Sequence, residues 1–149
     1  MSSTQNLITL HGSCHCGCIG VEFSTCQVAA TIRPRVCDCS FCQKHGAAYI
    51  SDPAGKLRLT IANPSAVHTY RQGSEVARFQ LCGECGVLVA VTFEHGGRVY
   101  GAVNAICLDG SAILGTAVSA SPQLLGSEAK VARWLQAWVP DVQFVVAGA

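Results

Sequence analysis

The chain has 149 residues; half of them are hydrophobic and only 13% are charged, a composition that suits one domain with a buried core and argues against disorder. The formal net charge is +1, without a run of about five or six like charges, which argues against nucleic acid or an anionic membrane as a partner. The sequence shows neither a secretory leader nor an apolar window long enough to span a membrane, so we expect a cytoplasmic protein whose thiols stay reduced.

Short apolar or alternating runs, separated by glycine, proline and other turn residues, predict β-strands. In chain order they are 7–11, 19–24, 30–36, 47–51, 57–61, 67–71, 76–80, 87–93 and 98–106. Strands this short, joined by tight turns, predict a mainly β, mostly antiparallel fold, a sandwich or an open barrel.

One helix is expected near the C-terminus, at residues 127–138. There Val131, Trp134, Leu135 and Trp138 have the spacing of a single apolar stripe. The last segment, 142–149, is either an edge strand or a tail that binds a partner. No repeat or linker divides the sequence, so we expect residues 1–149 to form a single domain. A chain this apolar could also bury surface in a homodimer.

Ten cysteines are a high number for a chain of this length. In a small secreted protein they would suggest a disulfide framework, but this chain is long enough for a sufficient core and the expected compartment is reducing. Metal binding is therefore the leading interpretation. The cysteines are Cys14, Cys16, Cys18, Cys26, Cys37, Cys39, Cys42, Cys82, Cys85 and Cys107.

Two cysteine pairs have the spacing of metal-binding knuckles. Cys14 and Cys16 follow a Gly-Ser turn, while Cys82 and Cys85 enclose one glycine and precede another. Zinc takes four soft ligands in a tetrahedron, and two such pairs supply them, which predicts a structural zinc site. A redox C-x-x-C motif at 82–85 is the alternative, but such a motif opens a helix, and the residues that follow here suggest a strand.

The segment CDCSFC at 37–42 supplies three further sulfurs without an obvious fourth. Ser40 and Gln43 have the spacing of a capping box, so a short helix is expected to start there, with Cys42 in its first turn. Three protein ligands and a vacant fourth position are typical of a reactive zinc. A closed site, completed by His45, is the alternative. Cys18, Cys26 and Cys107 are interpreted as small core residues, although Cys18 could compete as a ligand.

Four segments together resemble one known family. GSCHCG (12–17), CDCSFCQKHGA (37–47), LCGECG (81–86) and VNAICLDG (103–110) are similar to the glutathione-dependent formaldehyde-activating enzymes, whose domain is shared by centromere protein V-like proteins. The resemblance implies a fold of small antiparallel sheets called a β-tent. It also implies two zinc ions per chain, a structural zinc held by the 14/16 and 82/85 cysteine pairs and a catalytic zinc held by the 37–42 cysteines.

The function implied by this resemblance is that of a carbon–sulfur lyase, which adds glutathione to formaldehyde to give S-hydroxymethylglutathione. The vacant position on a zinc held by Cys37, Cys39 and Cys42 would accept the co-substrate thiol as a thiolate. His45, with Lys44 and Asp38, is a candidate to carry the proton. The cations considered for the carboxylates of glutathione are Arg33, Arg35, Lys44 and Arg71. The alternatives are a small-thiol binding or carrier module without turnover, and a structural two-zinc domain that binds a protein partner.

Overall fold

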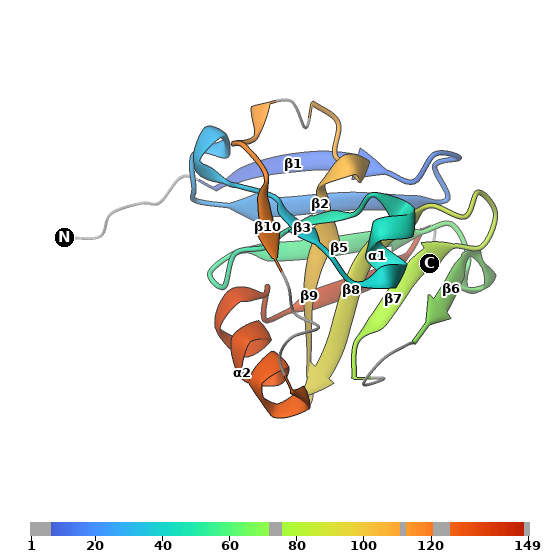
Figure 1. Cartoon of the computed structure of the whole chain (residues 1–149). Coiled ribbons are helices and arrows are strands. Elements are labelled where there is room, and N and C mark those ends of the chain that lie inside the picture. Colours follow the sequence, from blue (N-terminus) through green and yellow to red (C-terminus); the bar gives the residue numbers. More distant parts are fainter. Residues whose placement is uncertain (1–6, 72–75, 111–112, 121–125, 148–149) are drawn as a thin grey trace.

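The strands of the computed structural model, which describes residues 7–71, 76–110, 113–120 and 126–147, form two sheets (Figure 1). A four-stranded sheet has the order β1 (Ile8–Ser13), β2 (Ile19–Thr25), β5 (Lys56–Ile61) and β11 (Val142–Val146). A seven-stranded sheet has the order β10 (Val118–Ala120), β3 (Arg35–Cys37), β4 (Ala48–Ile50), β9 (Arg98–Asn104), β8 (Leu88–His95), β7 (Arg78–Cys82) and β6 (Val67–Tyr70). The helices are α1 (Ser40–His45) and α2 (Ser127–Ala137), with the 3-10 turns η1 (Ala29–Thr31), η2 (Pro64–Ala66) and η3 (Ala105–Cys107).

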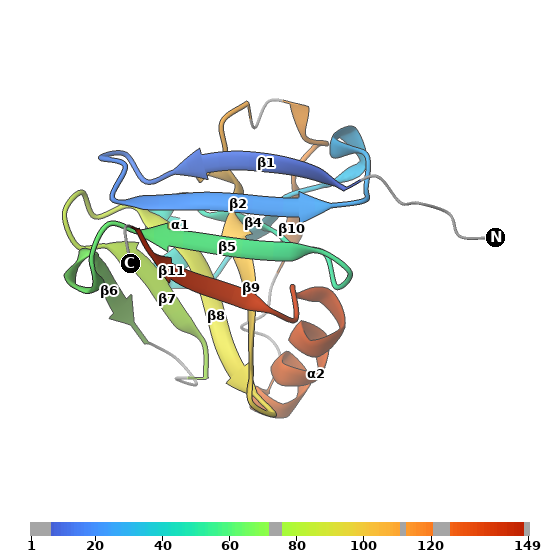
Figure 2. The same ribbon diagram turned by 180° about the vertical axis from the view of Figure 1, so that it is seen from behind.

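The two sheets pack face to face around one apolar core. Figure 2 shows the four-stranded sheet in front, with β8 and β9 running across behind it. Strand β2 alternates strictly between buried and half-buried residues, the period of a strand with one face on a core. Its buried residues, among them Phe23, join Leu59 of β5 and Val103 of β9 in a single cluster. This cluster fills the space between the sheets.

A second apolar cluster covers the opposite face of the seven-stranded sheet. Trp134 of α2 and Trp138, the C-cap residue of this helix, pack there against Phe93, and the cluster continues to Cys42 of α1. Strand β8 is buried at six consecutive residues because both faces of the sheet are covered at this point. The predicted apolar stripe of the C-terminal helix therefore has its place in this second cluster.

The mainly β class and the C-terminal helix are confirmed, and the segment after this helix is an edge strand, β11, in its described part. One detail of the prediction is wrong. The expected strand at 30–36 is instead η1 followed by the short strand β3, separated by a segment that contains Pro34, which lacks a backbone N–H. Most strand pairs are antiparallel, as predicted; the exceptions are β11, which runs parallel to β5, and β10, which runs parallel to β3.

In the parts of the chain that the structure describes, no helix has both the length and the apolar composition needed to cross a membrane.

Candidate metal centres

The first cysteine group joins the two sheets. Cys14 and Cys16 lie in the connection between β1 and β2, whereas Cys82 ends β7 and Cys85 lies in the turn before β8. Their four Sγ atoms all lie within 4.8 Å of one another. Cys16 Sγ is 3.7 Å from Cys14 Sγ and 3.5 Å from Cys82 Sγ. A hairpin of one sheet and a hairpin of the other therefore present their thiols to one point.

These separations fit a tetrahedral metal site. Four sulfurs bound about 2.3 Å from one zinc ion stand about 3.8 Å apart, close to the two measured distances. A disulfide would need a sulfur separation of about 2.05 Å, and all four of these cysteines are free. The donor set and its spacing suit zinc, which prefers thiolate ligands in this geometry.

The local backbone is arranged to receive negative charge on these sulfurs. The amide of Ile19 donates to Cys14 Sγ at 3.3 Å, and the amides of Glu84 and Cys85 both donate to Cys82 Sγ at 3.4 Å. Gly86, with φ of 81°, has the left-handed conformation that closes the second knuckle. Hydrogen bonds of this kind favour the thiolate form, the form that binds metal.

The thiols of this group differ in their affinity for a proton. Desolvation by burial raises the pKa of Cys14 to about 11. Desolvation acts in the same direction on Cys85, but hydrogen bonds from the backbone at Cys16 and Val87 outweigh it and lower the pKa of Cys85 to about 6. One thiol of the group therefore ionises readily while another holds its proton.

The fourth motif of the sequence, VNAICLDG (103–110), contacts the end of β1, just before the first cysteine pair. Gly12, next to Ser13 and Cys14, forms a bridge with Leu108. A Cβ atom on Gly12 would lie 2.0 Å from the carbonyl oxygen of Cys107, so only glycine fits. The amide of Asp109 donates to the carbonyl of His11 at 2.8 Å. Gly12, which precedes the first cysteine pair, and the LDG segment are therefore in direct contact.

The second cysteine group lies on the other face of the seven-stranded sheet. Cys37 ends β3, Cys39 is the N-cap residue of α1, and Cys42 lies in the first turn of that helix. Their Sγ atoms also lie within 4.8 Å of one another. The predicted helix is present, but its cap is Cys39 and not Ser40, because the sulfur of Cys39 accepts the amide of Cys42 at 3.4 Å.

Tyr49 is a neighbour of the second group that the sequence did not reveal. Its hydroxyl lies 3.2 Å from Cys42 Sγ, and both residues are buried. Burial, reinforced by the nearby thiols, raises the pKa of Tyr49, so this phenol stays protonated. The contact with Cys42 lowers the pKa of Cys37 to about 6, whereas Cys37 raises the pKa of Cys42. A thiolate within this group is therefore stabilised by its neighbours.

The residues predicted to carry a proton or to bind the carboxylates of glutathione have different surroundings. His45 is outside the group of sulfurs, and its ring packs on Phe41 with centroids 4.7 Å apart. Arg33 donates to the carbonyl of Thr116, while Lys44 and Arg71 are exposed.

Among the cysteines expected in the core, Cys107 is buried and Cys18 packs on the first cluster, but Cys26 is exposed because it follows the end of β2.

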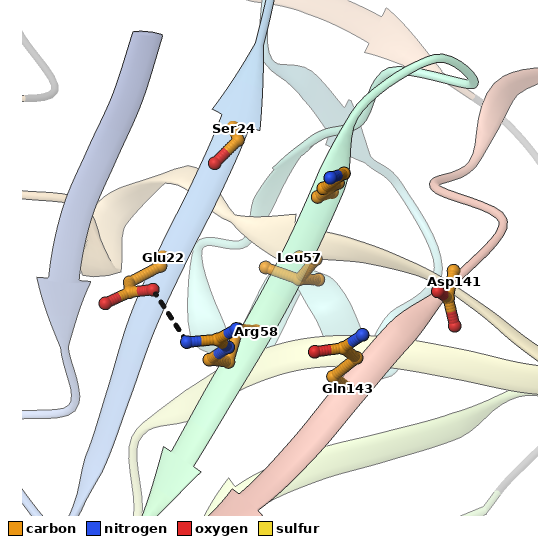
Figure 3. Close-up of a pocket in the computed structure, with 7 residues that line it drawn as sticks. Glu22, Ser24, Leu57, Arg58, Asp141 and Gln143 are labelled. Carbon is orange, nitrogen blue, oxygen red and sulfur yellow. Dashed lines mark ion pairs between the residues drawn. The ribbon is translucent and has the colours of Figure 1, made fainter. Parts of the chain in front are cut away.

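A polar depression on the outer face of the four-stranded sheet contains no cysteine. Figure 3 shows its side chains, with Arg58 3.8 Å from Glu22. Its lining residues are Glu22, Ser24, Lys56, Leu57, Arg58, Asp141 and Gln143. Charges of both signs are present and no thiol lies among them, so we place the candidate chemistry at the two cysteine groups.

Two sheets that carry one group of four cysteines and one group of three define a mainly β domain whose cysteine groups could each hold zinc. The chain belongs to the glutathione-dependent formaldehyde-activating enzyme family, whose model matches residues 9–121. The fold is similar to the crystal structure of a Rhodobacter sphaeroides protein, with a TM-score of 0.51 and 28% sequence identity over 67% of this chain and 88% of that one. No curated protein matches the chain.

Proposed function

We propose that this protein is a zinc-dependent carbon–sulfur lyase-type enzyme that adds a thiol such as glutathione to formaldehyde or a related small electrophile. Family membership supports a glutathione-dependent, formaldehyde-activating type of function. The observation that carries the finer proposal is the second cysteine group, where Cys37, Cys39 and Cys42 bring three sulfurs together. Within the described ranges, no histidine or carboxylate joins them, which leaves a fourth position for a substrate thiol.

The three cysteines would hold the ion, and the surrounding residues would keep them in place. Zinc bound there would supply a position that takes up a thiol as its thiolate near neutral pH. Cys39 fixes the start of α1 through the Cys42 amide, and Tyr49 holds Cys42 through its hydroxyl. In the addition itself, a sulfur–carbon bond forms, the carbonyl π bond of the aldehyde breaks, and its oxygen gains the proton that the thiol has lost.

The first cysteine group has a different proposed role. Cys14, Cys16, Cys82 and Cys85 would hold a structural zinc, since they offer four sulfurs and leave no position for a substrate. Because this group ties one hairpin of each sheet to the other, metal binding there would contribute directly to folding. We also propose that residues 1–149 form a single domain, since β11 completes the sheet that β1 begins.

One observation favours a second candidate, a small-thiol binding module without turnover. His45, the residue proposed to move a proton, packs on Phe41 and is not part of the sulfur group. Addition to an aldehyde needs a proton at the carbonyl oxygen, and a proton that His45 does not carry would have to come from another group or from water. Binding of a thiol needs no such group.

The experiment that separates the two is exchange of ¹³C-labelled formaldehyde with S-hydroxymethylglutathione, followed by NMR. The proposed enzyme should accelerate the exchange above the protein-free rate, and Cys39→Ser should remove the acceleration. Cys26→Ser is the matched control, since Cys26 is exposed and lies outside both groups. Thiol binding at the wild-type protein without any acceleration would replace the lyase by the binding module.

A further inference from the structure

Arg35 lies on the same sheet face as the second cysteine group. It pairs directly with Tyr49 across β3 and β4, so the two side chains project from the same face. Cys37 is two residues further along β3 and shares that face as well. Tyr49 in turn contacts Cys42. Arg35 and the three sulfurs therefore share one face of the sheet, with Tyr49 between them.

The guanidinium group of Arg35 is directed away from the sulfurs and toward α2. Its Nη2 donates to Ser51 Oγ at 2.7 Å, and this hydroxyl donates to the carbonyl of Ala137 at 2.7 Å. Ser51 lies two residues beyond Tyr49, which is about 6–7 Å along an extended chain. The positive charge of the guanidinium thus lies away from the sulfur group, where the chain after β4 meets the C-terminal end of α2.

Arg133 adds a second positive charge to this region. It lies four residues before Ala137, hence one turn away on the same face of α2. Burial lowers the pKa of the Arg35 guanidinium, and the charge of Arg133 lowers it further. The ion pairs within the described ranges are Arg58–Glu22 and Arg78–Glu94, so neither Arg35 nor Arg133 has a carboxylate partner there. A partly buried cation beside a like charge is unfavourable until an anion joins them.

We propose that Arg35 and Arg133 form an anion site that binds a carboxylate of the thiol substrate, an inference that rests on the proposed function. Its consequence is a substrate class: a thiol whose carboxylate lies several bonds from the sulfur, as the glycine carboxylate of glutathione does. Small neutral thiols would reach the cysteine group but not the arginines. Because the family match ends at residue 121, Arg133 belongs to a segment outside it. The C-terminal helix would thus add a specificity element to the site.

The test compares glutathione with its glycine monoethyl ester, which lacks the relevant charge, by calorimetric titration of the zinc-loaded protein. Wild type should prefer glutathione. Arg133→Gln, a change at an exposed residue, should weaken glutathione binding by about three- to five-fold and leave the ester unaffected. Arg35→Gln should cost about tenfold, because a partly buried charged hydrogen bond is worth more. Arg58→Gln, an equal change of charge on the outer face of the four-stranded sheet, should leave the preference unchanged.

The two possible failures are distinguishable. If both ligands bind the wild type equally, or if neither arginine variant changes the preference, the anion site is wrong while the thiol site stands. In that case Cys39→Ser would still abolish binding of both ligands. If neither ligand binds the zinc-loaded wild type, the proposed thiol site is wrong, and the inference built on it is overturned as well.

Discussion

The hydroxyl of Tyr49 lies 3.2 Å from Cys42 Sγ, while the backbone of the same tyrosine pairs with Arg35 on the neighbouring strand. One side chain therefore stands between the proposed thiol-binding centre and the proposed anion site. Tyr49 is buried, and its hydroxyl has Cys42 Sγ as its partner. This contact is the first that can be tested by mutation.

Tyr49→Phe should destabilise the protein modestly and leave the sheet intact. The substitution keeps the ring and removes one buried hydrogen bond, which is worth about 1 kcal/mol of the free energy of unfolding. Tyr70→Phe is the matched control because Tyr70 is exposed, and it should change stability by less than about 0.5 kcal/mol. Urea denaturation of the zinc-loaded proteins measures both. Equal effects of the two substitutions would show that the Tyr49–Cys42 contact adds nothing.

The two cysteine groups should differ in what they contribute to folding. The purified protein should hold about two zinc ions per chain. Cys82→Ser should lower the thermal midpoint strongly, since it removes a ligand that joins the sheets. Cys37→Ser should remove one zinc and largely spare the fold, because Cys37 lies at the end of a short strand. Metal analysis and thermal unfolding test this together. If both variants unfold alike, the division into a structural and a reactive site is wrong.

Gly12→Ala should be poorly tolerated although Gly12 coordinates nothing. A Cβ atom there would meet the Cys107 carbonyl at 2.0 Å, and the backbone would have to separate β1 from Leu108. Overpacking of this kind costs about 1–3 kcal/mol or more. Gly20→Ala is the matched control on the adjacent strand, where the nearest atom would be 3.8 Å away. Denaturant titration compares the two, and a similar stability for both variants would contradict the close approach.

The cysteine groups could be predicted from sequence because their members are close neighbours in the chain or form short pairs. A C-x-C or C-x-x-C pair fixes the relative position of its sulfurs by local geometry alone. The cap of α1 differs from the predicted one because serine is a usual N-cap residue, whereas here a cysteine sulfur accepts the amide. The residues usually found at N-caps accept the amide with an oxygen, so the local rule does not anticipate a sulfur in this place.

The long-range pairings had no local signal. Strand β11 lies parallel to β5, and β10 lies parallel to β3, although each pair is far apart in sequence. Such pairings depend on packing of the whole chain, not on the pattern within a segment. For the same reason the sequence offers Arg35 only as one of several candidate cations and contains no signal for Arg133. The end of α2 is held to Ser51, the hydrogen-bond partner of Arg35, and this brings the charge of Arg133 to bear on Arg35.

Trp138 contributes to the packing of α2 on the sheet. This residue is 6% exposed, stacks on Trp134 with ring centroids 4.6 Å apart and meets Phe93 at 5.6 Å. Trp138→Ala should cost about 3–5 kcal/mol, the usual loss for a buried aromatic side chain. Gln136→Ala, on the exposed side of the helix, should change stability by less than about 0.5 kcal/mol. Chemical denaturation measures both, with intrinsic fluorescence reporting the release of Trp134. A loss below about 1 kcal/mol for Trp138→Ala would mean that α2 is held mainly by the Ser51–Ala137 contact and not by its tryptophans.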